Sequence, residues 1–187
     1  CIIQSNWTNG VFKYNTSDQN PSSGTQNDLV ATNITDGYYD WNVICVDRAG
    51  NNNTLTINRS VGIDLNNPQI NITVLPTPIE FGLENSTINF TITDTFLNYT
   101  SVNFSYPNGT VLYNNTVNFT VYINNLTVLG NYTARAYAKD HSGRENTTLS
   151  NLTVRDTRQP LILLNSPGNN SVIKVSQINF SFNVSDL

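Results

Sequence analysis

Apolar and polar residues alternate along much of the chain, which is the pattern of β-strands with one buried face. The clearest example is the run Tyr39, Trp41, Val43 and Cys45, in which every second residue is apolar. No stretch shows the period of an amphipathic helix. Residues 69–156 form the one complete unit of the sequence, and within it the pattern predicts seven strands, near 69–75, 87–94, 101–106, 110–113, 117–123, 131–139 and 148–155. Seven short strands at this spacing predict an all-β, antiparallel β-sandwich.

One segment of the sequence recurs after about 90 residues. Residues 37–47 and 130–140 align at an offset of 93, and each copy ends in an Asp that is followed three residues later by a Gly, which favours a hairpin connection. Pro68 and Pro160 stand just before the next apolar runs, where we place domain boundaries. The expected domains are a partial one with the later five strands (1–66), a complete one (67–157), and the first two strands of a further one (158–187).

The segment from Asp36 to Asn51, DGYYDWNVICVDRAGN, resembles tandem immunoglobulin-like or fibronectin-III-like repeats of microbial cell-surface glycoproteins, particularly archaeal ones. The second copy matches less closely, because Ala134 and Ala138 stand in place of Trp and Cys. The resemblance extends over nearly the whole chain and implies tandem immunoglobulin-like domains at the outside of the cell. It is weak evidence for a function, because this fold serves many.

The resemblance also implies that Cys1 on an early strand is bonded to Cys45 on a late strand. Closing a loop of about 45 residues would stabilise the fold by on the order of 4 kcal/mol in the chain-entropy model. Such a disulfide implies an oxidising compartment. The alternative for Cys1 is a lipidated N-terminal anchor, as in bacterial lipoproteins.

Asparagine and hydroxyl residues take the place of charges, with 32 Asn and 38 Ser plus Thr but only 3 Lys. The N-glycosylation sequon Asn-x-Ser/Thr, in which x is not Pro, occurs 20 times, whereas random placement would give roughly 6 or 7. The sequon residues are Asn6, Asn15, Asn33, Asn52, Asn58, Asn71, Asn85, Asn89, Asn98, Asn103, Asn108, Asn114, Asn118, Asn125, Asn131, Asn146, Asn151, Asn169, Asn179 and Asn183. Dense N-glycosylation is therefore expected, and it too indicates an extracellular location.

The abundance of sequons could also arise from codon bias or from the polar-apolar-polar triplets of half-buried strands, and both alternatives stay open. Strand alternation explains Thr well but does not explain Asn, which is depleted in strands. In the triplets that enclose Phe90, Phe119 and Phe180 we expect the aromatic side chain to point inward and both sequon side chains to face solvent.

Charge and motifs favour no catalytic or nucleic-acid function. Only 12% of residues are charged and the net charge is −4, which does not suit a phosphate backbone. No apolar run approaches the roughly 18 residues of a membrane span, and there is no signal-peptide pattern or Met, so we expect a processed product or a stretch of a longer chain. The single His, His141, lies in a predicted turn, and neither Cys-x-x-Cys nor a phosphate loop occurs. We expect no enzyme, no catalytic residue, no cofactor and no metal ligand.

A Ca²⁺ site is the alternative to the expectation that the chain binds no metal. Asp47, Asp64, Asp140 and Asp156 lie near the predicted domain ends, where some tandem sandwich proteins bind Ca²⁺. Ca²⁺ takes six to eight oxygen ligands, and turn formation alone explains these residues.

We expect a structural extracellular glycoprotein, a repeat unit of a fibre, stalk or surface layer, with copies of itself or further repeats as partners. The two C-terminal strands would complete the five N-terminal strands of the next copy or repeat; an arbitrary stretch of a longer chain is the alternative. An adhesin for another cell or a polysaccharide is the second function, with the sequon-poor stretch from Gly24 to Ala31 or the aromatics Trp7, Tyr14 and Tyr99 as contacts. The third possible function is that of non-catalytic domains in a large secreted enzyme.

Overall fold

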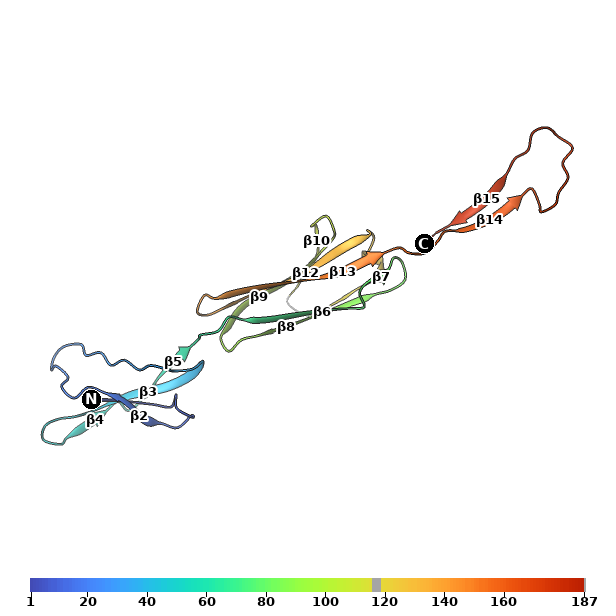
Figure 1. The fold of residues 1–187 in the computed structure, drawn as a ribbon. Coiled ribbons are helices and arrows are strands. Elements are labelled where there is room, and N and C mark those ends of the chain that lie inside the picture. The colour runs from blue at the N-terminus through green and yellow to red at the C-terminus, as the bar shows by residue number, and fades with distance from the viewer. Residues whose placement is uncertain (116–118, 187) are drawn as a thin grey trace. The chain divides into compact units, whose positions relative to one another are not determined.

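The computed structural model describes residues 1–115 and 119–186 (Figure 1). The described chain consists of β-strands, connecting turns and one short 3₁₀ helix, with no α-helix, which confirms the predicted all-β class. Within this part no helix is long and apolar enough to cross a membrane.

The early strands are β1 (Ile2–Ser5), β2 (Lys13–Ser17), β3 (Gly37–Val46), β4 (Asn52–Thr54), β5 (Arg59–Ile63), β6 (Gln69–Leu75), β7 (Ile79–Glu80) and β8 (Ser86–Thr93). They are followed by β9 (Leu97–Ser105), β10 (Val111–Asn115), β11 (Phe119–Val121), η1 (Ile123–Asn125), β12 (Gly130–Asp140), β13 (Glu145–Arg155), β14 (Leu161–Ser166) and β15 (Ser181–Ser185). Each of the seven strands predicted between residues 69 and 156 is present, apart from the part of the fifth that falls on residues 117 and 118, outside the described residues. The short strand β7 was not predicted, and it pairs in parallel with β13.

The chain divides into two compact units. Unit 1 comprises Cys1–Gln69, Thr93–Tyr99 and Ala138–Asn146, and unit 2 comprises Ile70–Ile92, Thr100–Tyr137 and Thr147–Leu187.

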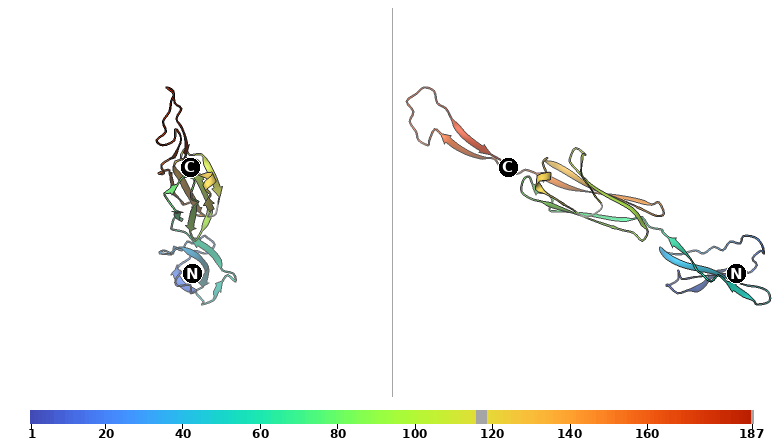
Figure 2. Two further views of the ribbon diagram at one scale, coloured as in Figure 1. Left: turned by 90° about the vertical axis from the view of Figure 1, so that its right-hand side faces the viewer. Right: turned by 180° about the vertical axis from the view of Figure 1, so that it is seen from behind.

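The core of unit 2 is a β-sandwich. One sheet has the order β10-β9-β12-β13-β7, the other has the order β11-β8-β6, and the layers can be followed in Figures 1 and 2. Val74 and Ile88 of the smaller sheet pack in one buried cluster with Phe104, Tyr132 and Leu152 of the larger sheet. Tyr132 is completely buried, stacks on Phe104 with ring centroids 5.5 Å apart, and accepts a hydrogen bond of 3.0 Å from the backbone N–H of Val128.

The main sheet of unit 1 has the strand order β2-β1-β3-β4, with β5 also paired to β3. Because β1 pairs antiparallel with β3 and Ile2 lies opposite Ile44, Cys1 comes next to Cys45. The predicted disulfide between these two residues is present. It closes the sheet at the start of the described chain.

The two repeated turns have the predicted form. At the end of β3, the backbone N–H of Asp47 donates to the carbonyl of Asn51 at 2.8 Å, and at the end of β12 that of Asp140 donates to the carbonyl of Arg144 at 3.0 Å. The glycines of these turns have φ values of +88° at residue 50 and +92° at residue 143, a conformation that favours glycine.

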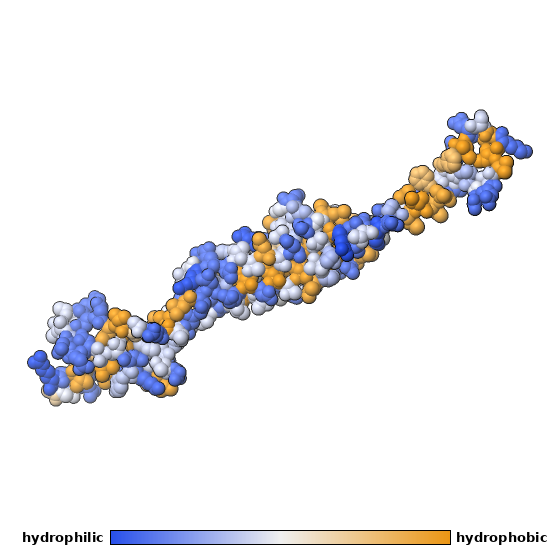
Figure 3. Space-filling model, in the orientation of Figure 1, coloured by the Kyte–Doolittle hydropathy of each residue, from blue (hydrophilic) through white to orange (hydrophobic). Residues whose placement is uncertain are grey.

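Strands β14 and β15 form a two-stranded antiparallel sheet, and all their residues are exposed. Figure 3 shows apolar side chains gathered over this pair. Because Ile162 lies opposite Val184 and Leu164 opposite Phe182, these four side chains share one face.

The inward orientation predicted for three aromatics is met only in part. Phe90 is half-buried while Asn89 and Thr91 are exposed, as expected. Phe180 is 72% exposed, so the prediction was wrong there; it precedes β15, which has no second sheet over it in the described chain. The side chains of Asn118 and Phe119 lie outside the described residues.

Candidate functional site

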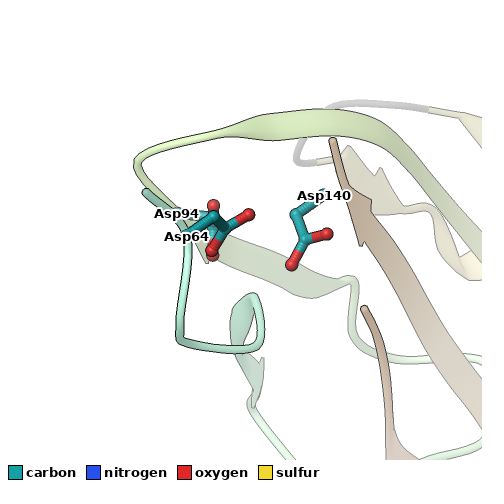
Figure 4. A group of neighbouring side chains, drawn as sticks. All are labelled: Asp64, Asp94 and Asp140. Carbon is teal, nitrogen blue, oxygen red and sulfur yellow. The ribbon is translucent and has the colours of Figure 1, made fainter. Parts of the chain in front are cut away.

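Three aspartates converge in unit 1, each at the C-terminal end of a strand (Figure 4). Asp64 follows β5, Asp94 follows β8, and Asp140 is the last residue of β12. Their carboxylates offer oxygen atoms that all lie within 4.8 Å of one another. We call these three residues the aspartate cluster.

Asp140 is the most buried member of the cluster, with 1% of its surface exposed. Its Oδ1 accepts hydrogen bonds of 2.8 Å from the Ser142 hydroxyl and 2.8 Å from the backbone N–H of Arg144. Its Oδ2 is buried and accepts no hydrogen bond from any described residue. Burial by itself raises the pKa of this carboxyl, but the hydrogen bonds from residues 142–144 outweigh burial and hold the pKa below its ordinary value. The group is therefore ionised at neutral pH.

The other two members are half-buried. The Oδ2 of Asp64 is also buried without a hydrogen-bond partner among the described residues, and Asp94 accepts a bond of 2.7 Å from the backbone N–H of Phe96. A neighbouring cation is Arg144, whose Nη1 donates to the backbone carbonyl of Asp64 at 2.6 Å and to the Ser142 hydroxyl at 2.8 Å. No ion pair found in the described chain includes an aspartate of the cluster. The positive charge of this one guanidinium is therefore fewer than the three negative charges of the cluster.

Close packing holds the three strand ends in place. Phe96 is 5% exposed, and its ring lies 4.4 Å from that of Tyr38, measured between centroids. It also covers Gly62, where a Cβ atom would come within 2.7 Å of the Phe96 ring. The backbone N–H of His141 donates to the Phe96 carbonyl at 2.9 Å, and the Asn146 side chain donates to the Pro68 carbonyl at 2.8 Å. These contacts therefore fix the positions of the strand ends that carry the three aspartates.

An open depression adjoins the cluster at Asp94. Its volume is about 420 Å³, and oxygen-bearing side chains dominate its lining: Asp36, Asn66, Asn67, Gln69, Thr93, Asp94 and Thr95. It gives water or an ion a path to Asp94 and offers further oxygen atoms close by.

Of the four aspartates named from the sequence, the structure brings together two, Asp64 and Asp140. Asp47 is exposed and its two oxygens accept bonds within its own turn, from Ala49 and Asn51. Asp156 is exposed and accepts a bond from the backbone N–H of Arg158. Asp94 was missed, although its position at the end of the strand predicted near 87–94 was a usable signal. His141 lies exposed in the turn where it was predicted.

The sequon asparagines line the surface. Of the 20, 15 are exposed, four are half-buried (Asn6, Asn103, Asn125 and Asn146), and Asn118 lies outside the described residues. Eleven lie in strands: Asn15, Asn52, Asn71, Asn89, Asn98, Asn103, Asn114, Asn131, Asn146, Asn151 and Asn183. The buried Asn42 is not part of a sequon, and its side chain bonds to Leu55 and Asn58.

A second cavity of unit 1 has a volume of about 790 Å³. Trp7 and Tyr39 contribute aromatic rings to its lining, residues 30–33 contribute part of a loop, and the sequon residues Asn15 and Asn33 lie at its wall. Tyr14 and Tyr99, the other aromatics named from the sequence, are 66% and 55% exposed.

The comparisons with known proteins assign no family: no family model and no curated protein matches the chain.

Proposed function

We propose that the chain is a structural, N-glycosylated extracellular protein whose immunoglobulin-like β-sandwiches are repeat units of a fibre, stalk or surface layer. The observation that carries the proposal is the placement of the sequons. Eleven sequon asparagines occupy strands, where Asn is disfavoured, and none of those eleven is buried. A strand that needed only a polar outward residue would use Thr, so the choice of Asn at these positions favours a role for the amide itself as a glycan acceptor.

The Cys1–Cys45 disulfide supports the same location, because such bonds persist in oxidising compartments. Glycans on strand faces would also keep the protein soluble and shield it from proteases. The surface has few charges of its own, since 12% of the residues are Asp, Glu, Lys or Arg. A coated sandwich of this kind suits a spacer or surface layer, in which length and resistance to proteases matter.

The experiment is glycopeptide mass spectrometry on material from the natural source, with and without reduction of the disulfide. We expect glycans on most of the exposed sequons and a linked pair of peptides that contain Cys1 and Cys45. Asn20, which is exposed but precedes a proline and so lies outside the sequon rule, is the internal control. Unmodified asparagine at most of the exposed sequons would contradict the proposal.

Assembly by strand complementation is the second part of the proposal. On β12, the buried alanines 134, 136 and 138 occupy the positions that repeat alignment matches with Trp41, Val43 and Cys45 of β3. These residues of β3 are only half-buried, and with Ile3 and Leu29 they line a cavity of about 410 Å³. A pair of strands equivalent to β6 and β8 would cover this face.

The β14–β15 pair has the required face. Ile162 and Leu164 match Ile70 and Ile72 of β6, which face the interior of the sandwich, and Phe182 matches Ile92 of β8. We infer that β14–β15 covers the five-stranded sheet of the next copy or of the next repeat in a longer chain. A contact of this head-to-tail type propagates into a fibre.

Light scattering after size-exclusion chromatography tests assembly from separate copies. Phe182→Asp places a charge on the apolar face and should leave the protein monomeric. Leu163→Asp makes the same change on the opposite face, where Leu163 pairs with Asn183, and should leave self-association intact. A wild-type chain that stays monomeric at millimolar concentration would contradict assembly from separate copies.

An adhesin is the alternative function, and the cavity beside Trp7 favours it, because an aromatic ring with polar neighbours suits a sugar. The same glycopeptide map separates the two functions. Glycans on Asn15 and Asn33 would fill the cavity wall and favour the structural role, whereas bare asparagines at these two positions would favour the adhesin.

A further inference from the structure

The geometry points to a Ca²⁺ site formed by Asp64, Asp94 and Asp140, in which one ion ties together the ends of β5, β8 and β12. This inference does not depend on glycosylation or on assembly.

Two carboxylate oxygens of the aspartate cluster are buried without a hydrogen-bond donor among the described residues. Buried polar atoms are nearly always hydrogen-bonded, so each exception requires an explanation. Asp64 and Asp140 each have a buried Oδ2 without a hydrogen-bond donor in the described chain, and both belong to one cluster. Figure 4 shows the Asp140 carboxylate directed toward the other two. A cation between the three would bind both oxygens at once.

The aspartates of the two repeated turns differ in how their second carboxylate oxygen is bound. Asp47 occupies the same position in the first repeat as Asp140 in the second, and both accept a 2.8 Å bond from the backbone N–H four residues later. In each copy, one carboxylate oxygen of the aspartate therefore accepts the backbone hydrogen bond that stabilises the turn. The second oxygen of Asp47 accepts a bond of 2.8 Å from the Asn51 side chain, but that of Asp140 is buried without a donor, since Arg144 replaces the Asn. Turn formation explains Asp47 completely and leaves one oxygen of Asp140 unexplained.

The aspartate cluster concentrates negative charge. Three carboxylates within 4.8 Å of one another repel, and the single guanidinium of Arg144 compensates for only one of them. A divalent ion would neutralise the remaining two charges.

Ligand type and spacing favour calcium. Ca²⁺ binds oxygen at about 2.3–2.6 Å, so ligands on opposite sides of the ion are about 4.6–5.2 Å apart, and the 4.8 Å limit fits one coordination shell. Mg²⁺ demands octahedral geometry and usually keeps several waters, with only one or two carboxylates. Zn²⁺ favours nitrogen and sulfur, which the cluster lacks. The depression at Asp94 gives access to water for the remaining ligand positions.

The test uses the complete 187-residue chain, treated with EDTA and returned to chelator-free buffer. We expect calorimetric titration with CaCl2 to show one ion per chain, with a Kd on the order of 10⁻⁴–10⁻³ M, as in extracellular modules, or tighter. At 10 mM CaCl2 the Tm should rise by roughly 3 to 10 °C. No binding up to 10 mM, or an equal rise in Tm with MgCl2, would overturn the inference.

Repeat-equivalent variants make the test specific. Asp140→Asn and Asp94→Asn should each weaken Ca²⁺ binding at least tenfold and reduce the Tm rise at 10 mM CaCl2 by about half or more. Asp47→Asn and Asp156→Asn, which change the matching aspartates outside the cluster, should leave the Kd within twofold. If Asp140→Asn does not fold by circular dichroism, the half-buried Asp94→Asn decides. Equal losses in the cluster variants and the two controls would indicate a nonspecific effect of acidic residues and would overturn the site.

Discussion

Strands β3 and β12 have related sequences, yet they differ sharply in burial. On β12 the inward positions are fully buried: Tyr132, Ala134, Ala136 and Ala138. On β3 the matching positions are only half-buried: Tyr39, Trp41, Val43 and Cys45. The sheet β11-β8-β6 packs its buried side chains in one core with those of β12, whereas no such second sheet covers β3 within the described part of unit 1. The alternation therefore determines the strand, and the opposite layer determines how deeply it is buried.

The largest expected difference between the two strands concerns their aligned tyrosines. Tyr132→Ala removes a fully buried ring that packs on Phe104 and Tyr106, and should destabilise the protein by about 3–5 kcal/mol. Tyr39→Ala should cost less than half as much, because Tyr39 is already half-exposed. Urea denaturation followed by circular dichroism measures both. Equal losses in stability would show that β3 is buried as deeply as β12 in solution. Such burial would be expected if a pair of strands such as β14–β15 covers β3.

Removal of the disulfide should have the next largest effect, and only on unit 1. Cys45→Ser opens a link between residues 44 positions apart, which should lower stability by about 2–4 kcal/mol. Tryptophan fluorescence follows unit 1 selectively, since Trp7 and Trp41 are the only two tryptophans and both belong to it. An unchanged fluorescence midpoint in the variant would contradict a stabilising role for the bond.

A smaller effect is expected where Phe96 covers Gly62. Gly62→Ala places a methyl group within 2.7 Å of the Phe96 ring and should cost about 1–3 kcal/mol through overpacking. Phe96→Leu should relieve part of this cost, so the double variant should be more stable than the sum of the two single changes predicts. Strictly additive losses, measured by tryptophan fluorescence in urea, would argue against the contact.

The smallest effect belongs to Glu80 of unit 2. Hydrogen bonds from the Thr157 hydroxyl at 2.7 Å and the Thr157 N–H at 3.0 Å, together with Arg155, hold the Glu80 pKa below its ordinary value of 4.5. Since the pKa is lowered in the folded state, this carboxylate stabilises the protein above about pH 4.5, and the contribution is lost as pH falls through the lowered value. Glu80→Gln should therefore reduce the acid dependence of the Tm, with the exposed Glu84→Gln as control.

Much of the fold could be predicted from alternation and turn chemistry. The hairpin turns at Asp47 and Asp140 follow from local sequence, and the Cys1–Cys45 bond followed from the resemblance. The aspartate cluster could be predicted only in part. Asp47 and Asp140 look alike in sequence because they form the same turn, and only tertiary packing buries one of them. Asp94 belongs to a third segment, and its proximity to Asp64 depends on long-range contacts such as Phe96 against Gly62.

The Cys1–Cys45 bond has a mechanical consequence. A pulling force that enters at Cys1 passes through the two sulfur atoms to Cys45, so residues 2–44 bear no load while the bond is intact. An extended chain spans about 3.3–3.6 Å per residue, so the 44-residue separation corresponds to roughly 150 Å of hidden length. Single-molecule stretching should show this length only after reduction. An intact bond would thus keep β1, β2 and most of β3 out of the force path in a protein under tension.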